Sequence, residues 1–326
     1  MCQCNGKKEK VYTLGIIDSQ NAEPYYSARI SMLDFLKSKG YVEKKNLKII
    51  YFTIGNSKKK GLLALDKVVA KKPDVIFVNG TMATLSVKDS SYFNNPKHKF
   101  VFTCVTDPVG VGVIDDFGVE NPYNITGVSY PVPVVTRLRF VMSIMPKLKK
   151  IGLVYADMPQ SHSYKKWVEK ALKEENDLKH LKVFFQKVHF IEGEEGTKKM
   201  AERAKKYILE MDKKVDVFLS PNDQMGVQKP FAKVVFENST KPLIGLGLKD
   251  IMEKWGPTAV IYPSYKSMGV QSAQMIIKLF KGVNVKSIPA QWPKEHGFAF
   301  DLKKAKTFNL KISKRYLELA GENIVR

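Results

Sequence analysis

The sequence predicts an α/β protein with two doubly wound, Rossmann-like lobes joined by a three-segment hinge. Three observations lead to this prediction. Strand-like and helix-like segments alternate along nearly the whole chain, the alternation restarts near residue 130, and each half holds a buried-strand pattern that ends in an acidic loop. These patterns are residues 100–110, with Thr106-Asp107, and residues 215–224, with Asn222-Asp223. Continuous apolar runs are typical of parallel strands covered on both faces.

The first half alternates four strand patterns with three helix patterns, which predicts a run of parallel β-α units. The period of the apolar residues separates the two kinds of element, and glycine, proline and lysine mark the helix ends. The expected strands are residues 11–17, 48–52, 74–78 and 99–104, and the expected helices are residues 27–39, 61–71 and about 82–88.

The second half repeats this order after an extended segment that holds two prolines. That segment is residues 127–133. The expected strands that follow are residues 150–155, 183–188, 215–219 and 242–245, and the expected helices are residues 136–145, 164–173, 195–211 and about 226–236.

The last part of the chain is expected to be divided between the two lobes. Residues 258–263 and 285–292 are expected to cross between lobes, with the long helix 265–280 returning to the first. Three crossings permit rigid-body closure around a ligand. The expected division is residues 11–130 plus 263–284 for lobe 1, residues 131–262 plus 285–326 for lobe 2, and residues 1–10 as an N-terminal tether.

The composition is that of a folded protein with a large basic excess. The chain has 326 residues, is 44% hydrophobic, and carries 54 Lys+Arg against 32 Asp+Glu, a net charge of +22. No apolar run approaches the roughly 18 residues of a membrane span. The lysines stand in short, scattered clusters without a recognition motif, so we expect a solvated surface and no nucleic-acid partner, with attraction to an anionic membrane as the weaker alternative.

The three cysteines fit neither a disulfide framework nor a zinc site. Cys104 lies in an apolar strand pattern and is expected to be a packed core thiol. Cys2 and Cys4 precede the polar residues 5–10, which is how a mature bacterial lipoprotein begins, so either cysteine is a candidate for lipidation. The other interpretation, a Cys-x-Cys metal or redox pair, lacks further ligands nearby.

Several stretches together resemble one family, the ABC-transporter substrate-binding proteins of the tryptophan/tyrosine-binding type. The resemblance extends from about residue 11 to residue 312, and its specific part is Val-Thr-Asp-Pro-Val-Gly followed by Asn-Ile-Thr-Gly-Val. The matching stretches are residues 40–43 with Asn46, residues 72–77, 102–110, 124–129, 149–155 and 221–223.

The resemblance implies a type I periplasmic-binding-protein fold with three crossovers. It also implies an extracytoplasmic, lipid-anchored receptor, in the periplasm or on the outer face of the bacterial cytoplasmic membrane, that delivers a small solute to an ABC permease. We expect a monomer without a cofactor. The chain departs from the family's usual pattern at residues 79–82, at residues 156–162 and at Asn222, where a threonine is usual. The fold and class therefore carry over, whereas the identity of the solute does not.

A zwitterionic solute such as an amino acid needs an acceptor for its ammonium group and donors for its carboxylate. Asp107 or Asp223 would accept from the ammonium through charge-assisted hydrogen bonds. Thr81 and residues 161–163 stand where helices are expected to begin, where free backbone N–H groups favour anions. The alternative is that these side chains only cap their helices.

Other positions are expected to line the same cleft. Tyr130 and Tyr262 lie in predicted crossings and would stack on an aromatic solute, unless they only pack the hinge. Residues 18–21 follow the first strand, although turn formation explains them as well. The full set of expected ligand contacts is Ser19, Gln20, Asn21, Gly80, Thr81, Met82, Thr106, Asp107, Tyr130, Asp157, Ser161, His162, Ser163, Asn222, Asp223, Gln224 and Tyr262.

The sequence shows no signature of an enzyme. The five histidines lack metal-ligand spacing, and no nucleophile elbow, phosphate-binding glycine loop or zinc-protease motif is present. We therefore expect no catalytic residue and no metal. The alternatives are a ligand-sensing receptor of the same fold without transport, a repressor, which would need a helix-turn-helix before residue 11, and an enzyme on an open α/β sheet.

Overall fold

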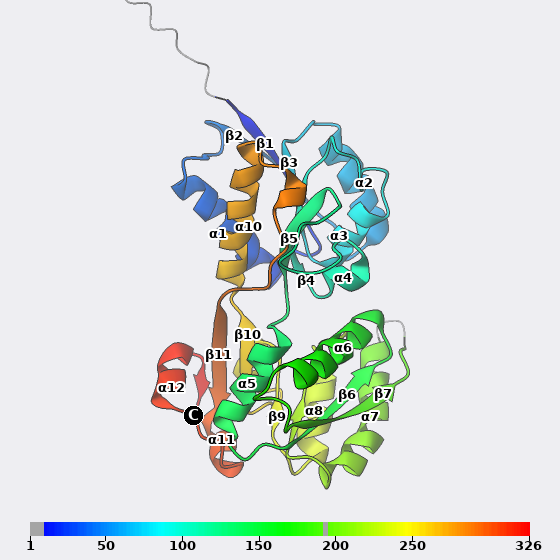
Figure 1. Ribbon diagram of the computed structural model, residues 1–326, viewed down its shortest axis with the longest axis vertical. Coiled ribbons are helices and arrows are strands. Elements are labelled where there is room, and N and C mark those ends of the chain that lie inside the picture. Colours follow the sequence, from blue (N-terminus) through cyan, green and yellow to red (C-terminus); the bar gives the residue numbers. More distant parts are fainter. Residues whose placement is uncertain (1–9, 192–194) are drawn as a thin grey trace, which may run out of the picture. The chain divides into compact units, whose positions relative to one another are not determined.

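The computed structural model describes residues 10–191 and 195–326 (Figure 1). The chain forms two compact units. Unit 1 comprises the residues up to Tyr130 together with Ser264–Glu295, and unit 2 comprises Pro131–Pro263 and His296–Arg326. The chain therefore passes from one unit to the other three times, as expected from the sequence.

Unit 1 is built on a five-stranded sheet in which all neighbouring strands are parallel, in the order β2-β1-β3-β4-β5 (Figure 1). Helices α1 and α10 pack against each other beside this sheet. The strands are β1 (Tyr12–Asp18), β2 (Leu47–Thr53), β3 (Val75–Asn79), β4 (Phe100–Val105) and β5 (Ile125–Ser129). The helices are α1 (Tyr25–Ser38), α2 (Lys58–Val69), α3 (Thr81–Lys88), α4 (Pro108–Val111), α10 (Tyr265–Phe280) and the 3₁₀ turn η1 (Val285–Ser287).

The sheet of unit 1 is buried on both faces, which explains its continuous apolar runs. Side chains of a strand alternate between faces. Val75 and Phe77 of β3 pack with the apolar residues of α1 and α10, whereas Ile76 and Val78 pack with those of α2 and α3. Removing both faces from water is the main contribution to the stability of this unit.

Unit 2 contains a seven-stranded sheet in the order β12-β11-β10-β9-β8-β6-β7, parallel except where β11 pairs with β10. The strands are β6 (Lys150–Ala156), β7 (Lys182–Val188), β8 (Val217–Leu219), β9 (Leu243–Ile244), β10 (Ala259–Pro263), β11 (His296–Asp301) and β12 (Ile324–Val325). The helices are α5 (Val134–Ile144), α6 (Pro159–Glu174), α7 (Gly196–Asp212), α8 (Lys229–Asn238), α9 (Leu248–Met252), α11 (Leu302–Thr307) and α12 (Lys314–Ala320).

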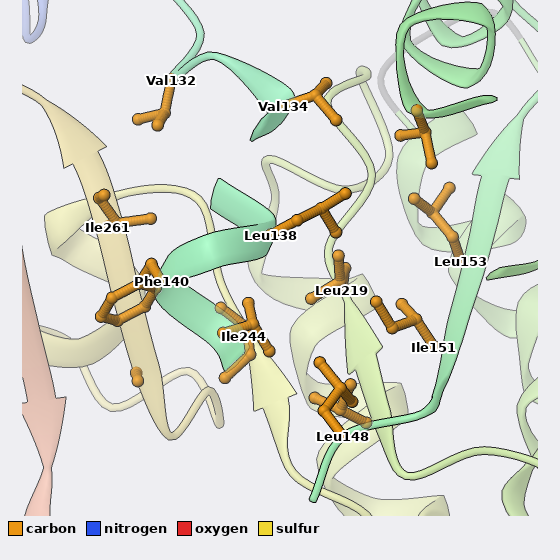
Figure 2. Close-up of a cluster of buried hydrophobic side chains, with 14 of the residues drawn as sticks. Val132, Val134, Leu138, Phe140, Leu148, Ile151, Leu153, Leu219, Ile244 and Ile261 are labelled. Carbon is orange, nitrogen blue, oxygen red and sulfur yellow. The ribbon is translucent and has the colours of Figure 1, made fainter. Parts of the chain in front are cut away.

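The largest apolar cluster of unit 2 lies between α5 and the central strands (Figure 2). Leu138 of α5 faces Leu219 of β8, and Phe140 lies beside Ile261 of β10. Phe140 also contacts the rings of Phe298, Phe300 and Tyr316, so the same helix anchors the C-terminal part of the chain.

Two expectations about the chain path need correction. Residues 285–292 do not cross between units, because Thr126 Oγ1 donates to Ile288 O (2.6 Å) and Gln291 pairs with Val128, so this segment runs beside β5 within unit 1. Residues 285–295, expected in the second lobe, therefore belong to unit 1. Helix α6 begins at Pro159 rather than near residue 164.

No helix within residues 10–191 and 195–326 is long and apolar enough to cross a membrane. Cys104 is buried, as expected. Cys2 and Cys4, the candidates for lipidation, lie outside the described residues.

Candidate solute-binding loops

The loops after β1, β3 and β4 of unit 1 lie at one edge of the sheet, because these strands are parallel neighbours. We call this edge, residues 18–24, 53–57, 79–82, 105–110 and 129–130, the carboxyl edge of unit 1. In open α/β sheets the corresponding edge is where ligands bind. All nine predicted contacts from residues 19–130 belong to it.

Asp18, which is not among the expected ligand contacts, is the centre of a polar network at this edge. Its carboxylate is fully buried and accepts from Asn79 Nδ2 (3.0 Å) and Tyr51 OH (3.4 Å), and it pairs with Arg29 Nε (2.8 Å). The Arg29 guanidinium also lies over the Tyr51 ring, 4.4 Å from its centroid. Burial raises the pKa of Asp18 from 3.8 to about 6, although Arg29 favours the charged form.

The raised pKa of Asp18 predicts a pH-dependent contribution to stability. The folded state binds this proton more tightly than the unfolded state, so the contribution is complete below pH 3.8 and is lost as the pH rises through 6. The difference between the pKa of Asp18 in the folded state and its ordinary value corresponds to about 3 kcal/mol in the free energy of unfolding. Carbon-13 NMR should give a midpoint near pH 6 for the Asp18 carboxyl, and Asp18→Asn should remove this dependence. A midpoint near pH 4 would contradict the assignment.

Gly80, Thr81 and Met82 form the start of α3. No side chain caps this helix at Gly80, whose φ is +100°, and the hydroxyl of Ser19 accepts from Ala83 N (3.1 Å). Ser19 is thus a buried part of the turn, while Thr81 and Met82 are half-buried. The first N–H groups of such a helix favour an anion.

Replacing Gly80 with alanine should lower the free energy of unfolding by about 2 kcal/mol and weaken solute binding, because the start of α3 must move. A Cβ atom here would lie 2.5 Å from Ser19 Oγ and 2.6 Å from Tyr25 Cε1. Gly40→Ala is the matched control, since Gly40 also has a positive φ (+88°) but nothing within 4 Å of the added atom. Urea unfolding and calorimetry of both variants test this, and equal solute affinity in both would contradict it.

Thr106 and Asp107 follow β4 beside the start of α3. Thr106 N donates to Thr81 Oγ1 (3.5 Å), and Asp107, 4% exposed, accepts from Gly110 N (2.8 Å) as the N-cap of α4. The pairing of β4 with β5 shifts between Thr103 and Val105, where Cys104 has a φ of +55°. A backbone irregularity of this kind re-aims the residues that follow it.

The remaining predicted contacts of unit 1 are Gln20, Asn21 and Tyr130. Gln20 and Asn21 are exposed, and Asn21 Oδ1 accepts from Arg29 Nη2 (3.0 Å), so Asn21 extends the network around Asp18. Tyr130 is half-buried and stacks on Tyr265, the first residue of α10, with centroids 6.2 Å apart.

In unit 2, the carboxylate of Asp223 is held by hydrogen bonds from its own loop and from the neighbouring segments. Its carboxylate accepts from Ala156 N (2.8 Å), Ser161 Oγ (3.0 Å), Met225 N (3.0 Å) and Gly226 N (2.8 Å). Burial raises the pKa of Asp223, and these bonds oppose that rise. Asp223 and the buried Ser161 therefore tie the loop after β8 to the end of β6 and the start of α6.

Asp157 is the accessible carboxylate at the end of β6. It pairs with Lys187 Nζ (2.9 Å) and with His162 Nε2 (2.7 Å). The hydrogen bonds from Lys187 and then His162 hold the pKa of Asp157 below its ordinary value.

The other predicted residues of unit 2 differ in exposure. Asn222 is buried, Ser163 is half-buried and Gln224 is exposed. Tyr262 is half-buried, and its hydroxyl accepts from Asn323 Nδ2 (3.1 Å). Burial raises the pKa of Tyr262.

Sequence reasoning missed Arg137, a fully buried arginine on α5. It donates to Tyr164 OH (2.9 Å) and to the carbonyl oxygens of Ser220 (3.0 Å), Ile244 (3.2 Å) and Gly245 (3.1 Å). It thereby holds the ends of the neighbouring strands β8 and β9 together.

Asp250 secures the same loop after β9. Its buried carboxylate accepts from Leu246 N (2.8 Å) and Gly247 N (3.1 Å), directly after the carbonyls held by Arg137. Burial raises the pKa of Asp250, and the positive charge of Arg137 is among the groups that oppose the rise. The loop is thus fixed by a cation on its carbonyls and an anion on its amides.

Comparison with known proteins places the chain among solute-binding proteins. The sequence model of one family, ABC transporter substrate binding protein, matches residues 16–324. A tyrosine-binding protein of Clostridioides difficile (strain R20291) is 23% identical over 287 residues, which cover 87% of this chain and 76% of that protein.

Solved structures share the fold at low identity. A substrate-binding protein with adhesive properties from Clostridium difficile, ligand-free and open, has a TM-score of 0.75 at 20% identity, covering 97% of this chain and 98% of that one. An ABC domain from Streptococcus pneumonia in complex with L-Trp has a TM-score of 0.68 at 19% identity, covering 97% and 100%. A conserved domain protein from Vibrio cholerae has a TM-score of 0.70 at 21% identity, with the same coverage.

Proposed function

Because the chain belongs to the ABC transporter substrate binding protein family, we propose that it is the receptor of an importer for an amino acid with an aromatic side chain. Receptors of this family work outside the cytoplasmic membrane and bind a small solute. The solute would be held at the carboxyl edge of unit 1 and enclosed by hinge closure. The protein would deliver it to a permease and catalyse nothing.

The observation that carries this proposal is that the start of α3, where Gly80 has no side chain to cap the helix, lies beside a carboxylate at the carboxyl edge of unit 1. The amides of Thr81 and Met82 offer donors for the carboxylate of an amino acid. Asp107 follows the neighbouring strand, and its loop is tied to Thr81 by the bond from Thr106 N. The amides at the start of α3 favour a negative group, and Asp107 favours a positive group. These two adjacent loops therefore match the carboxylate and the ammonium group of a zwitterion.

The aromatic part of the proposal comes from the tyrosines and from the relatives. Tyr130 and Tyr265 form a stacked pair and lie next to points at which the chain passes from one unit to the other. Tyr262 lies near the end of β10. Rings of this kind stack on a second ring with about 0.5–1.5 kcal/mol beyond burial. The tyrosine-binding relative and the fold neighbour with bound L-Trp support the same solute class.

The other predicted contacts take supporting roles in this proposal. Asp223, Ser161 and Ser19 position loops, because hydrogen bonds within their own unit already engage them. Gln20, Gln224 and Ser163 are proposed to contact the solute directly, and Asp157 with His162 to form the rim of unit 2.

The anchoring and assembly follow from the same proposal. Either Cys2 or Cys4 would carry the lipid that keeps the receptor at the outer face of the membrane. We propose a monomer that meets an ABC permease and binds no nucleic acid.

Calorimetry with a panel of solutes tests the proposed function. L-tyrosine, L-tryptophan and L-phenylalanine should bind with dissociation constants in the micromolar range or below, and leucine, lysine and arabinose at least about tenfold more weakly. Binding of arabinose but none of the amino acids would contradict the solute class. Turnover of any bound compound would contradict the receptor role.

A further inference from the structure

The lysines of unit 1 gather at the edge of the sheet opposite to the candidate solute-binding loops. We call this edge the amino edge of unit 1 and define it as Lys10 with residues 37–48, 67–75, 94–100, 121–125 and 278–286. These segments end the helices and begin the parallel strands, so the topology brings them to one side (Figure 1). The lysines are Lys10, Lys37, Lys39, Lys44, Lys45, Lys48, Lys67, Lys71, Lys72, Lys97, Lys99, Lys278, Lys281 and Lys286.

Contacts between the segments confirm that they share this edge. The Tyr12 ring, at the start of β1, stacks on Phe280 at the end of α10 (4.5 Å) and meets Tyr41 edge-on (5.5 Å). Asn121 N donates to Lys286 O (3.0 Å), and Asn124 Nδ2 donates to His98 O (3.1 Å). The lysines therefore form one surface rather than separate clusters.

This surface carries almost no compensating negative charge. Its defined segments contain only Glu43 and Asp74 as carboxylates, and Asp74 accepts a hydrogen bond from Thr13 N (2.7 Å) and pairs with Lys10 Nζ (4.0 Å). Asp66 and Glu120 flank the segments. Apart from Lys99, which is half-buried, all of the lysines are exposed.

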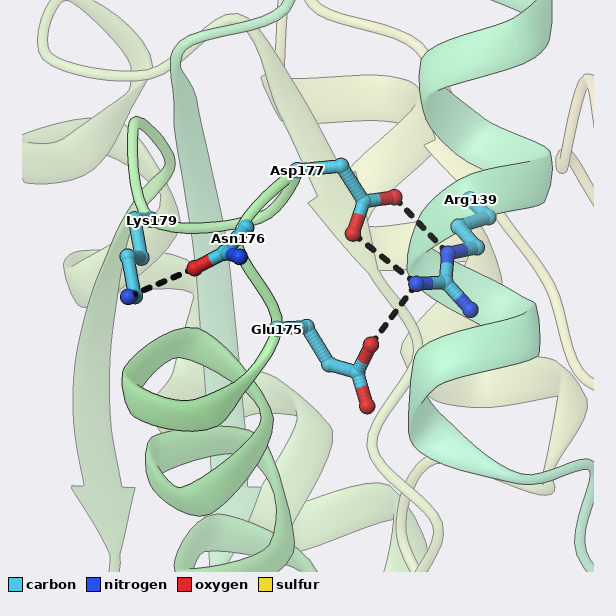
Figure 3. A network of polar contacts seen from close by, with 5 residues as sticks. All are labelled: Arg139, Glu175, Asn176, Asp177 and Lys179. Carbon is cyan, nitrogen blue, oxygen red and sulfur yellow. Dashed lines mark hydrogen bonds and ion pairs between the residues drawn. The ribbon is translucent and has the colours of Figure 1, made fainter.

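Two other sheet edges, the carboxyl edge of unit 1 and the amino edge of unit 2, show a smaller excess of lysines over carboxylates. The loops of the carboxyl edge of unit 1 contain Asp18, Glu23 and Asp107 and no lysine or arginine, and the lysines that follow directly, residues 58–60 at the start of α2, include Lys58, which pairs with Asp89. The amino edge of unit 2, defined in the same way as residues 145–150, 173–183, 212–217 and 239–243, also has lysines, but carboxylates stand among them. There Arg139 pairs with Glu175 (2.7 Å) and with both oxygens of Asp177 (2.7 and 2.8 Å; Figure 3).

We propose that the amino edge of unit 1 binds the surface of an anionic lipid bilayer. Each lysine near such a surface adds attraction, and the effect falls off within a Debye length, about 8 Å at physiological salt. The chain enters unit 1 at Lys10 on this edge, so the residues that precede it, with the candidate anchor cysteines, are attached there. Binding by this edge would leave the opposite, solute-binding edge directed away from the lipid.

Vesicle binding of the full chain tests the proposal, and it does not depend on the solute. All proteins carry Cys2→Ser and Cys4→Ser, so that no lipid or thiol contributes. The parent should sediment with vesicles of phosphatidylglycerol and phosphatidylcholine in equal parts but not with phosphatidylcholine alone. Lys45→Glu, Lys48→Glu, Lys71→Glu and Lys97→Glu together should lower the partition coefficient by about 100-fold or more.

The matched control makes the same change of net charge in unit 2. Lys149→Glu, Lys150→Glu, Lys213→Glu and Lys214→Glu, all at exposed positions of its amino edge, should lower the partition coefficient by less than about fivefold. Equal losses in both variants, or tighter binding to a DNA duplex than to the anionic vesicles, would overturn the proposal. Lysine acetylation of the parent gives a second readout, because vesicles should protect the amino edge of unit 1 and not that of unit 2.

Discussion

Replacing Arg137 with methionine should lower the free energy of unfolding of unit 2 by about 4 kcal/mol. The backbone carbonyl oxygens of Ser220 and Gly245 lose the donor that Arg137 provides in a buried site, and Ile244 O keeps only its bond from Ser220 N. Methionine fills much of the volume but donates nothing, so the cost of buried, unsatisfied acceptors remains. Urea unfolding followed by tryptophan fluorescence measures the effect, because Trp167 and Trp255 both belong to unit 2.

Arg139→Met is the matched control for this prediction. Arg139 lies two residues further along the same helix, but its partners Glu175 and Asp177 are at the exposed surface (Figure 3). Exposed ion pairs add little to stability, so this variant should unfold close to the wild-type urea concentration. If both variants unfold alike, Arg137 does not have the structural role that its hydrogen bonds indicate.

Replacing Asp107 with asparagine should weaken binding of an aromatic amino acid by about 10- to 100-fold without lowering the unfolding midpoint. The variant removes the negative charge that would receive the solute's ammonium group, and charge-assisted bonds of this kind contribute about 1.5–3 kcal/mol. Asparagine caps helices as well as aspartate does, so the bond from Gly110 N is kept. Calorimetry and thermal unfolding on the same preparation separate the two effects.

Asp223→Asn should show the opposite pattern and serves as the comparison. All four hydrogen bonds to Asp223 come from donors of its own unit, and an amide nitrogen would face some of them. The unfolding midpoint should therefore fall. If Asp107→Asn leaves the affinity unchanged, or if only its stability falls, Asp107 does not bind the ammonium group.

The alternation of elements was predictable because it depends on local periodicity. The helix expected at residues 265–280 has these bounds in the structure, and the buried strand before Thr106 was found from its apolar run. The path of residues 285–292 was not predictable, because it depends on the bond between Thr126 and Ile288, which are far apart in the sequence.

The individual roles at the strand ends were harder to predict. Asp107 and Asp223 occupy equivalent positions in the sequence pattern, but the number of donors around each carboxylate is decided by the folded loops. Arg137 was missed because arginine is usually a surface residue. Its spacing from Val134, Leu138 and Val141 places it on the apolar face of α5, and this was the signal that could have identified it.

A crystal structure of the protein with its tightest-binding aromatic amino acid tests the central claim most directly. We expect the solute's carboxylate at the amides of Thr81 and Met82 and its ammonium group at Asp107. A solute bound away from the carboxyl edge of unit 1 would contradict the account.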